Sequence, residues 1–143
     1  MNLLETKILE NLEVLRAAVI AEPEALFDLH AFARITDCGT LHCTLGLACT
    51  MSYFKEQGLR FNELSFFSPR MEGENHTTAR SFDKLFGEFS YDRLFTSAGC
   101  GTRDKELGFE RNYFLYRIGQ SMTDKELAIA RLDAAIATYK EEV

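Results

Sequence analysis

The sequence predicts a mainly α-helical fold, built as a single compact helical domain over residues 1–143. Two patterns carry this prediction. Apolar side chains recur every three or four residues near both ends of the chain, and the stretch from about 41 to 57 is apolar nearly all round. A length of 143 residues is typical of one domain. Hydrophobic residues make up 46% and charged residues 27%, which excludes a disordered or fibrous chain.

The N-terminal segment has a clear amphipathic pattern. Its apolar stripe predicts a helix over residues 3–20, with charged side chains on the other face. Pro23 cannot continue such a helix, so we expect the helix to end before it. The stripe consists of Leu4, Ile8, Leu12, Leu15 and Val19.

A buried central helix is predicted over about 41–57. Residues 37–40 (Asp-Cys-Gly-Thr) predict a turn before it, because glycine and aspartate favour turn conformations. Thr40 is a suitable N-cap, and Gly58 ends the helix. Residues 24–37 show no clean period, so their structure stays open.

Irregular loops follow the central helix. Residues 59–76 contain proline and glycine and predict a connection with one short strand, at 64–67. A short helix over 77–86 is expected to end at Gly87, and another turn or two of helix follows Ser90.

Two further helices complete the predicted fold. One covers residues 106–120, and the last begins at Thr123. Thr123 and Glu126 have the spacing of a capping box, in which the two side chains cap each other's backbone N–H groups. The stripe of this last helix is Ile129, Leu132, Ile136, Tyr139 and Val143.

The N-terminal residues predict a cytoplasmic protein. Their early charges interrupt the apolar core that a secretory signal needs, and no stretch approaches the roughly 20 apolar residues of a membrane span. The four cysteines are therefore expected to be free thiols without bound metal, since the cytosol is reducing.

The densest cluster of reactive side chains lies within residues 38–43. A thiol near a helix start is favoured as a thiolate, which makes Cys43 a candidate nucleophile, although the sequence identifies no base for it. We therefore assign no catalytic residue and consider a structural turn and helix start the better interpretation. The candidate binding residues are Cys38, Gly39, Thr40, His42 and Cys43.

Metal binding by this cluster is the second interpretation. Cys49, with Cys100 or His76, can complete a set of four soft ligands. However, the spacings C-x₄-C and C-x₅-C differ from those of zinc knuckles, and there is no second pair. We expect no metal and no cofactor.

Charge limits the range of partners. The formal net charge of −6 argues against non-specific binding to nucleic acid or to an anionic membrane. Aromatic residues alternate with arginines at 109–117, as on a base-stacking surface, but a buried helix face edged by arginines gives the same pattern. The expected partner is an unknown protein or a small ligand. Pairing of two copies through the N-terminal helix is a further option.

An internal repeat is a separate hypothesis. Residues 38–46 and 100–108 share the pattern C-G-T-x-x-x-x-L-G, and the apolar positions that follow coincide at the same offset. A true duplication of 38–58 in 100–120 would give a turn and a helix at both places.

The run from Phe27 to Phe32, followed by C-G-T-x-x-C-x-x-G at 38–46, resembles a pattern in small, mostly uncharacterised phage and bacterial proteins. The resemblance implies a helical protein in a phage or mobile-element setting, with no known reaction and no catalytic residue to carry over. We therefore expect a non-enzymatic binding or interaction protein. The alternative is a small thiol-dependent enzyme or metal-binding protein that uses Cys43.

Overall fold

The structure, a computed structural model, describes most of the N-terminal two thirds of the chain and the C-terminal helix. The described residues are 1–27, 33–36, 39–62, 68–74, 77–78, 80–95 and 123–141. The predicted strand at 64–67, the predicted helix at 106–120 and the second copy of the proposed repeat lie outside them.

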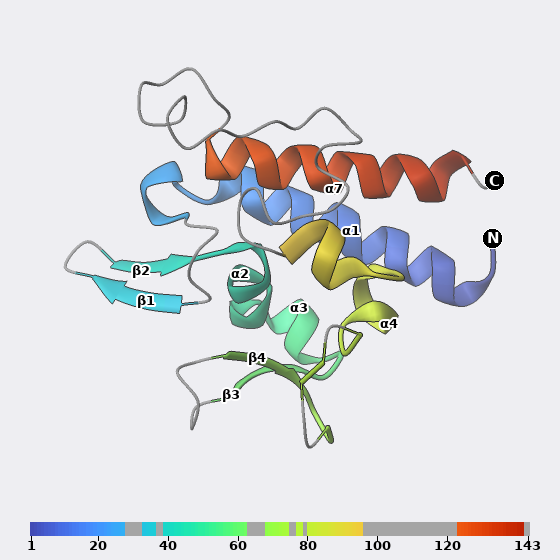
Figure 1. Cartoon of the computed structure of the whole chain (residues 1–143), viewed down its shortest axis with the longest axis horizontal. Helices are drawn as coiled ribbons and strands as arrows, with labels where there is room; N and C mark the ends of the chain where they lie inside the picture. Colours follow the sequence, from blue (N-terminus) through green and yellow to red (C-terminus); the bar gives the residue numbers. More distant parts are fainter. Residues whose placement is uncertain are drawn as a thin grey trace.

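Two long helices lie side by side and antiparallel, α1 (Leu3–Ala21) and α7 (Asp124–Glu141), so that the start of α1 and the end of α7 lie at the same end of the pair (Figure 1). The predicted stripe of α1 is buried from Ile8 to Val19, whereas Leu4 is 54% exposed. On α7, the residues buried at this contact and around it include Leu127, Ala128, Leu132 and Ile136. The fold is mainly helical, as the sequence predicts.

Polar groups fix the ends of both helices. Asn2 caps α1, because its Oδ1 accepts a hydrogen bond from the Glu5 N–H at 2.8 Å. At the start of α7, the Glu126 N–H donates to Thr123 Oγ1 (3.1 Å) and the Thr123 N–H donates to Glu126 Oε1 (3.3 Å), which confirms the predicted capping box. Lys125 donates to the carbonyl of Ile20 in the last turn of α1 and to that of Glu22, the residue that follows the helix, and so joins the two helices.

The central segment differs from its prediction. The helix begins later, as α2 (Thr44–Thr50), and breaks at Met51 before the short α3 (Ser52–Lys55). Thr40 is not its N-cap, because residues 39–42 form a strand instead. The cap is Cys43, whose Sγ accepts a hydrogen bond from the Gly46 N–H at 3.4 Å. Strand pairing with an earlier segment thus overrides the local helical pattern.

Two short β-hairpins extend from the helical body, more strand than the sequence predicts (Figure 1). In the first, β1 (Ala33–Thr36) pairs antiparallel with β2 (Gly39–His42). The sequence predicts a turn over residues 37–40, but Gly39 and Thr40 lie in β2, and residues 37–38 are outside the described ranges. In the second, β3 (Leu59–Asn62) pairs antiparallel with β4 (Ser68–Met71). Gly58, with φ of 98°, permits the sharp turn from α3 into β3.

The predicted helix at 77–86 forms only at its end, as α4 (Asp83–Phe86), after a turn at residues 80–82. Gly87 ends it, as predicted, in a left-handed conformation with φ of 103°. The turn expected after Ser90 is a π-helix, Tyr91–Phe95.

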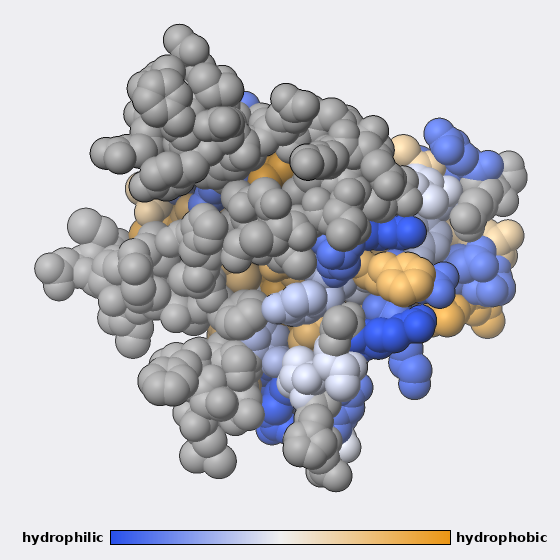
Figure 2. Space-filling view, viewed as in Figure 1, coloured by the Kyte–Doolittle hydropathy of each residue, from blue (hydrophilic) through white to orange (hydrophobic). Residues whose placement is uncertain are grey.

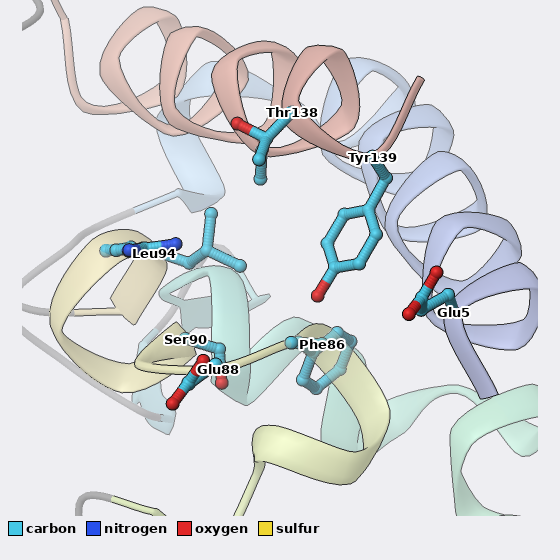
Figure 3. Close-up of a pocket in the computed structure, with 10 residues that line it drawn as sticks. Glu5, Phe86, Glu88, Ser90, Leu94, Thr138 and Tyr139 are labelled. Atoms are coloured by element: carbon cyan, nitrogen blue, oxygen red, sulfur yellow. The ribbon is translucent and has the colours of Figure 1, made fainter. Parts of the chain in front are cut away.

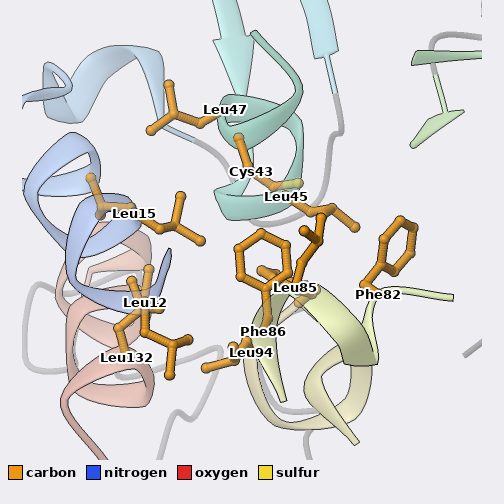
Figure 4. Close-up of a cluster of buried hydrophobic side chains, with 14 of the residues drawn as sticks. Leu12, Leu15, Cys43, Leu45, Leu47, Phe82, Leu85, Phe86, Leu94 and Leu132 are labelled. Carbon is orange, nitrogen blue, oxygen red and sulfur yellow. The ribbon is translucent and has the colours of Figure 1, made fainter. Parts of the chain in front are cut away.

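The core lies where α1, α7, α2 and α4 meet (Figure 4). Phe86 is at its centre, with ring centroids 5.2 Å from Phe54 and 5.1 Å from Phe95. Asn11 is fully buried, and its amide donates to the Leu85 carbonyl at 2.9 Å. Across the described part of the chain, no helix has both the length and the apolar character needed to cross a membrane.

Candidate binding site

The structure describes four of the five residues singled out from the sequence, three of them in one strand. Gly39, Thr40 and His42 lie in β2, while Cys38 lies outside the described residues. Cys43 is only 2% exposed and forms the N-terminal cap of α2. Its thiol is therefore buried and accepts a hydrogen bond from the backbone N–H of Gly46.

The second thiol of this region, Cys49, is also buried, and it forms no disulfide. Burial, followed by the neighbouring Cys43, raises the pKa of the Cys49 thiol to about 12. A group with this pKa stays protonated at neutral pH, and a protonated thiol is a poor nucleophile and metal ligand. Within the ranges that the structure describes, no three His, Cys, Asp or Glu side chains are grouped closely enough to hold a metal ion.

The unusual local geometry lies elsewhere, in the loop between α4 and the π-helix. Phe89 has φ of 59°, the one positive φ among the described residues other than glycine. A bulky side chain rarely adopts this conformation, because its Cβ approaches the backbone too closely. Phe89 is also 48% exposed, so the fold holds a strained aromatic residue at its surface.

Two arginines flank the Phe89 ring. The guanidinium of Arg80 lies 5.2 Å from the ring centroid and that of Arg93 lies 5.7 Å from it, both within the range of cation–π attraction. Arg80 is itself held by Asp83 at 3.0 Å and by Glu88 at 3.6 Å. We call the set Phe89, Arg80 and Arg93 the Phe89 surface. On the face shown in Figure 2, hydrophobic side chains in orange lie directly beside strongly hydrophilic ones in blue.

A cavity of about 300 Å³ opens next to this loop (Figure 3). It lies between the 86–94 segment, the first turn of α1 and the last turns of α7. Its lining combines apolar groups with carboxylates, a guanidinium and hydroxyls, and consists of Glu5, Phe86, Gly87, Glu88, Ser90, Arg93, Leu94, Ala135, Thr138 and Tyr139.

Ser90 is a buried polar residue of this lining. Its side chain is 1% exposed, and its hydroxyl has no hydrogen bond among the described residues. An unsatisfied buried hydroxyl costs about 1–3 kcal/mol. Such a group in the wall of a cavity is a candidate contact for a ligand.

Sequence reasoning missed both features. The sequence pattern predicts only a helix stop at Gly87 and no role for Phe89. The segment Gly87-Glu88-Phe89-Ser90 does hold a usable signal, because an aromatic residue stands inside a short turn between two helical pieces. The cavity has no such signal, since its walls come from three segments far apart in the sequence.

The sequence matches no protein-family model, and neither the curated proteins nor the solved structures contain a significant match to the chain.

Proposed function

We propose that this protein is a non-enzymatic binding protein, of the phage or mobile-element type, that recognises a protein partner through the Phe89 surface. The observation that carries the proposal is the conformation of Phe89, an exposed aromatic side chain on a backbone with positive φ. Residues held in rarely populated backbone regions cluster at ligand-binding and switch sites.

The energetics of Phe89 favour a role in binding over a role in folding. A left-handed conformation costs a residue other than glycine roughly 1–3 kcal/mol. Each cation–π contact at an exposed site returns roughly 0.5–1 kcal/mol. The contacts with Arg80 and Arg93 thus about offset the strain, and the exposed half of the ring adds nothing to the stability of the monomer.

The residue types of the Phe89 surface match those of protein interfaces. Aromatic residues and arginine are enriched at interface centres, where a few of them supply most of the binding energy. We expect the partner to offer an apolar pocket for the Phe89 ring, bordered by carboxylates that meet Arg93 and Arg80.

The test is affinity capture from lysate with three forms of the protein. Phe89→Asn removes the ring, and asparagine tolerates the left-handed conformation. Ile20→Asn is the matched control, because Ile20 is an exposed apolar residue on α1, 45% exposed against 48% for Phe89. A partner of the Phe89 surface is captured by the wild type and by Ile20→Asn and is lost with Phe89→Asn. Partners that are captured equally by all three forms would exclude the Phe89 surface as their binding site.

A further inference from the structure

Beyond partner recognition, we infer that the cavity beside the Phe89 surface binds a small organic amine with an apolar body and a hydrogen-bonding group at its far end. A volume of about 300 Å³ is at the lower limit for small-molecule pockets, which restricts the ligand to a small molecule. The chemical class follows from what lines the cavity.

The apolar part of the lining selects the body of the ligand. Phe86 and Leu94, both buried, contribute from the 86–94 segment, and Ala135 and Tyr139 contribute from α7. Figure 3 shows the Tyr139 side chain reaching from α7 towards that segment. An aromatic or aliphatic body placed between these side chains leaves water and gains roughly 25 cal/mol for each Å² of apolar surface buried.

The charges of the lining favour a cation. Two acidic residues, Glu5 and Glu88, line the cavity together with one arginine, Arg93. Glu88 is already paired with Arg80 at 3.6 Å, and Arg93 lies over the Phe89 ring. The Glu5 carboxylate lies on the first turn of α1, where Asn2 Nδ2 donates to its Oε1 at 3.1 Å. This hydrogen bond orients Glu5 without neutralising it, so an ammonium group can bind there.

The Ser90 hydroxyl determines which group we expect at the far end of the ligand. Figure 3 shows Glu5 on one side of the Tyr139 hydroxyl, and Ser90 with Glu88 on the other. The Ser90 hydroxyl has no hydrogen-bond partner among the described residues, and serine has three staggered rotamers through which to turn it towards a ligand. A ligand with its ammonium at Glu5 and a hydroxyl at Ser90 would satisfy both groups.

Titration calorimetry with a matched set of small molecules tests this site. Phenethylamine carries the ammonium, tyramine adds a hydroxyl at the far end, and 3-phenylpropionate replaces the ammonium with a carboxylate. We expect both amines to bind, tyramine more tightly, and the carboxylate not to bind at millimolar concentration. Absence of binding by either amine overturns the proposal, as does equal binding of the carboxylate.

Three variants connect the binding to the residues. Glu5→Gln should weaken both amines about tenfold or more, as expected for loss of a charge-assisted hydrogen bond. Ala135→Leu fills the cavity and should abolish binding. Ser90→Ala should remove the advantage of tyramine over phenethylamine and leave the melting temperature unchanged or higher, because the hydroxyl has no partner to lose.

Glu24→Gln is the control for Glu5→Gln, since Glu24 is an exposed carboxylate outside the cavity lining. Amine affinity that is the same in Glu5→Gln and Glu24→Gln overturns the assignment of the ammonium to Glu5. Phe89→Asn should leave amine binding intact, because Phe89 is not part of the lining. The proposal for the cavity and the proposal for the Phe89 surface can therefore be contradicted independently of each other.

Discussion

Asn11 and Gln57 exchange two hydrogen bonds through their side-chain amides: Asn11 Nδ2 donates to Gln57 Oε1, and Gln57 Nε2 donates to Asn11 Oδ1, both at 3.0 Å. Asn11 also donates to the Leu85 carbonyl at 2.9 Å. One buried amide on α1 thereby joins the turn after α3 to α4. Its buried polar atoms are satisfied within a mostly apolar core, as the low polarity of such an environment requires.

Asn11→Ala is therefore expected to lower the free energy of unfolding by about 2–3 kcal/mol, because the Gln57 amide oxygen and the Leu85 carbonyl both lose the donor that Asn11 supplies. Urea unfolding of Asn11→Ala, Gln57→Ala and the double variant measures this. The double variant should cost less than the sum of the single ones, by roughly 0.5–1.5 kcal/mol. Additive effects would mean that the two amides do not interact in solution.

Gly87→Ala is expected to lower the stability by about 1–3 kcal/mol through backbone strain alone, since residue 87 has φ of 103° and ψ of 166°. A Cβ at this position would also lie 3.2 Å from Tyr139 Cζ and overlap the Tyr139 hydroxyl. In a Tyr139→Phe background the cost of Gly87→Ala should fall without vanishing. Thermal unfolding of the four forms measures both effects, and a Gly87→Ala protein as stable as the wild type would contradict the close approach.

The helix ends show how far the sequence predicts the fold. The start of α7 is predicted because its signal is local: Thr123 and Glu126 lie within one turn and satisfy each other. The start of α2 is predicted wrongly because β2 pairs with β1, and this pairing holds Thr40 in a strand. Cys43 is instead the N-cap of α2, although cysteine seldom has this role.

The break at Met51 has a similar origin. The Thr50 hydroxyl donates to the Leu47 carbonyl at 2.7 Å, and Met51 has an extended ψ of 127°. Side-chain hydrogen bonds of this kind compete with the helical backbone. The redirected chain buries Phe54 completely against Phe86, a tertiary contact that an uninterrupted apolar pattern does not reveal.

Alkylation of the cysteines distinguishes the proposal of a binding protein from the alternative of a thiol-dependent enzyme. Cys43 is 2% exposed, and burial raises the pKa of Cys49 to about 12, so iodoacetamide at neutral pH should modify neither thiol until the protein unfolds. Peptide mass spectrometry, with and without urea, identifies the sites. Fast modification of Cys43 in the folded protein, faster than in urea, would favour the thiol-dependent enzyme.

Acid should weaken a surface contact between α1 and α3. The hydrogen bond from the Tyr53 hydroxyl (2.7 Å), followed by the nearby charge of Lys7, lowers the pKa of Glu10 below its ordinary value of 4.5. A lowered pKa in the folded state means that the contribution is fully present above pH 4.5 and is lost as the pH falls through the folded-state pKa. The stability difference between the wild type and Glu10→Gln, measured by urea unfolding, should therefore be larger at pH 7 than at pH 3. An equal difference at both pH values would show that the charge of Glu10 is not involved.

The claim that the protein holds Phe89 for recognition rather than for its own stability is tested most directly by the free energy of unfolding of Phe89→Asn. Relief of the positive φ at residue 89 should about offset the lost contacts with Arg80 and Arg93, so the variant should lie within about 1 kcal/mol of the wild type. Phe86→Ala, in the core, should cost about 3–5 kcal/mol in the same urea titration. A loss for Phe89→Asn as large as that for Phe86→Ala would contradict the account, because Phe89 would then serve the fold.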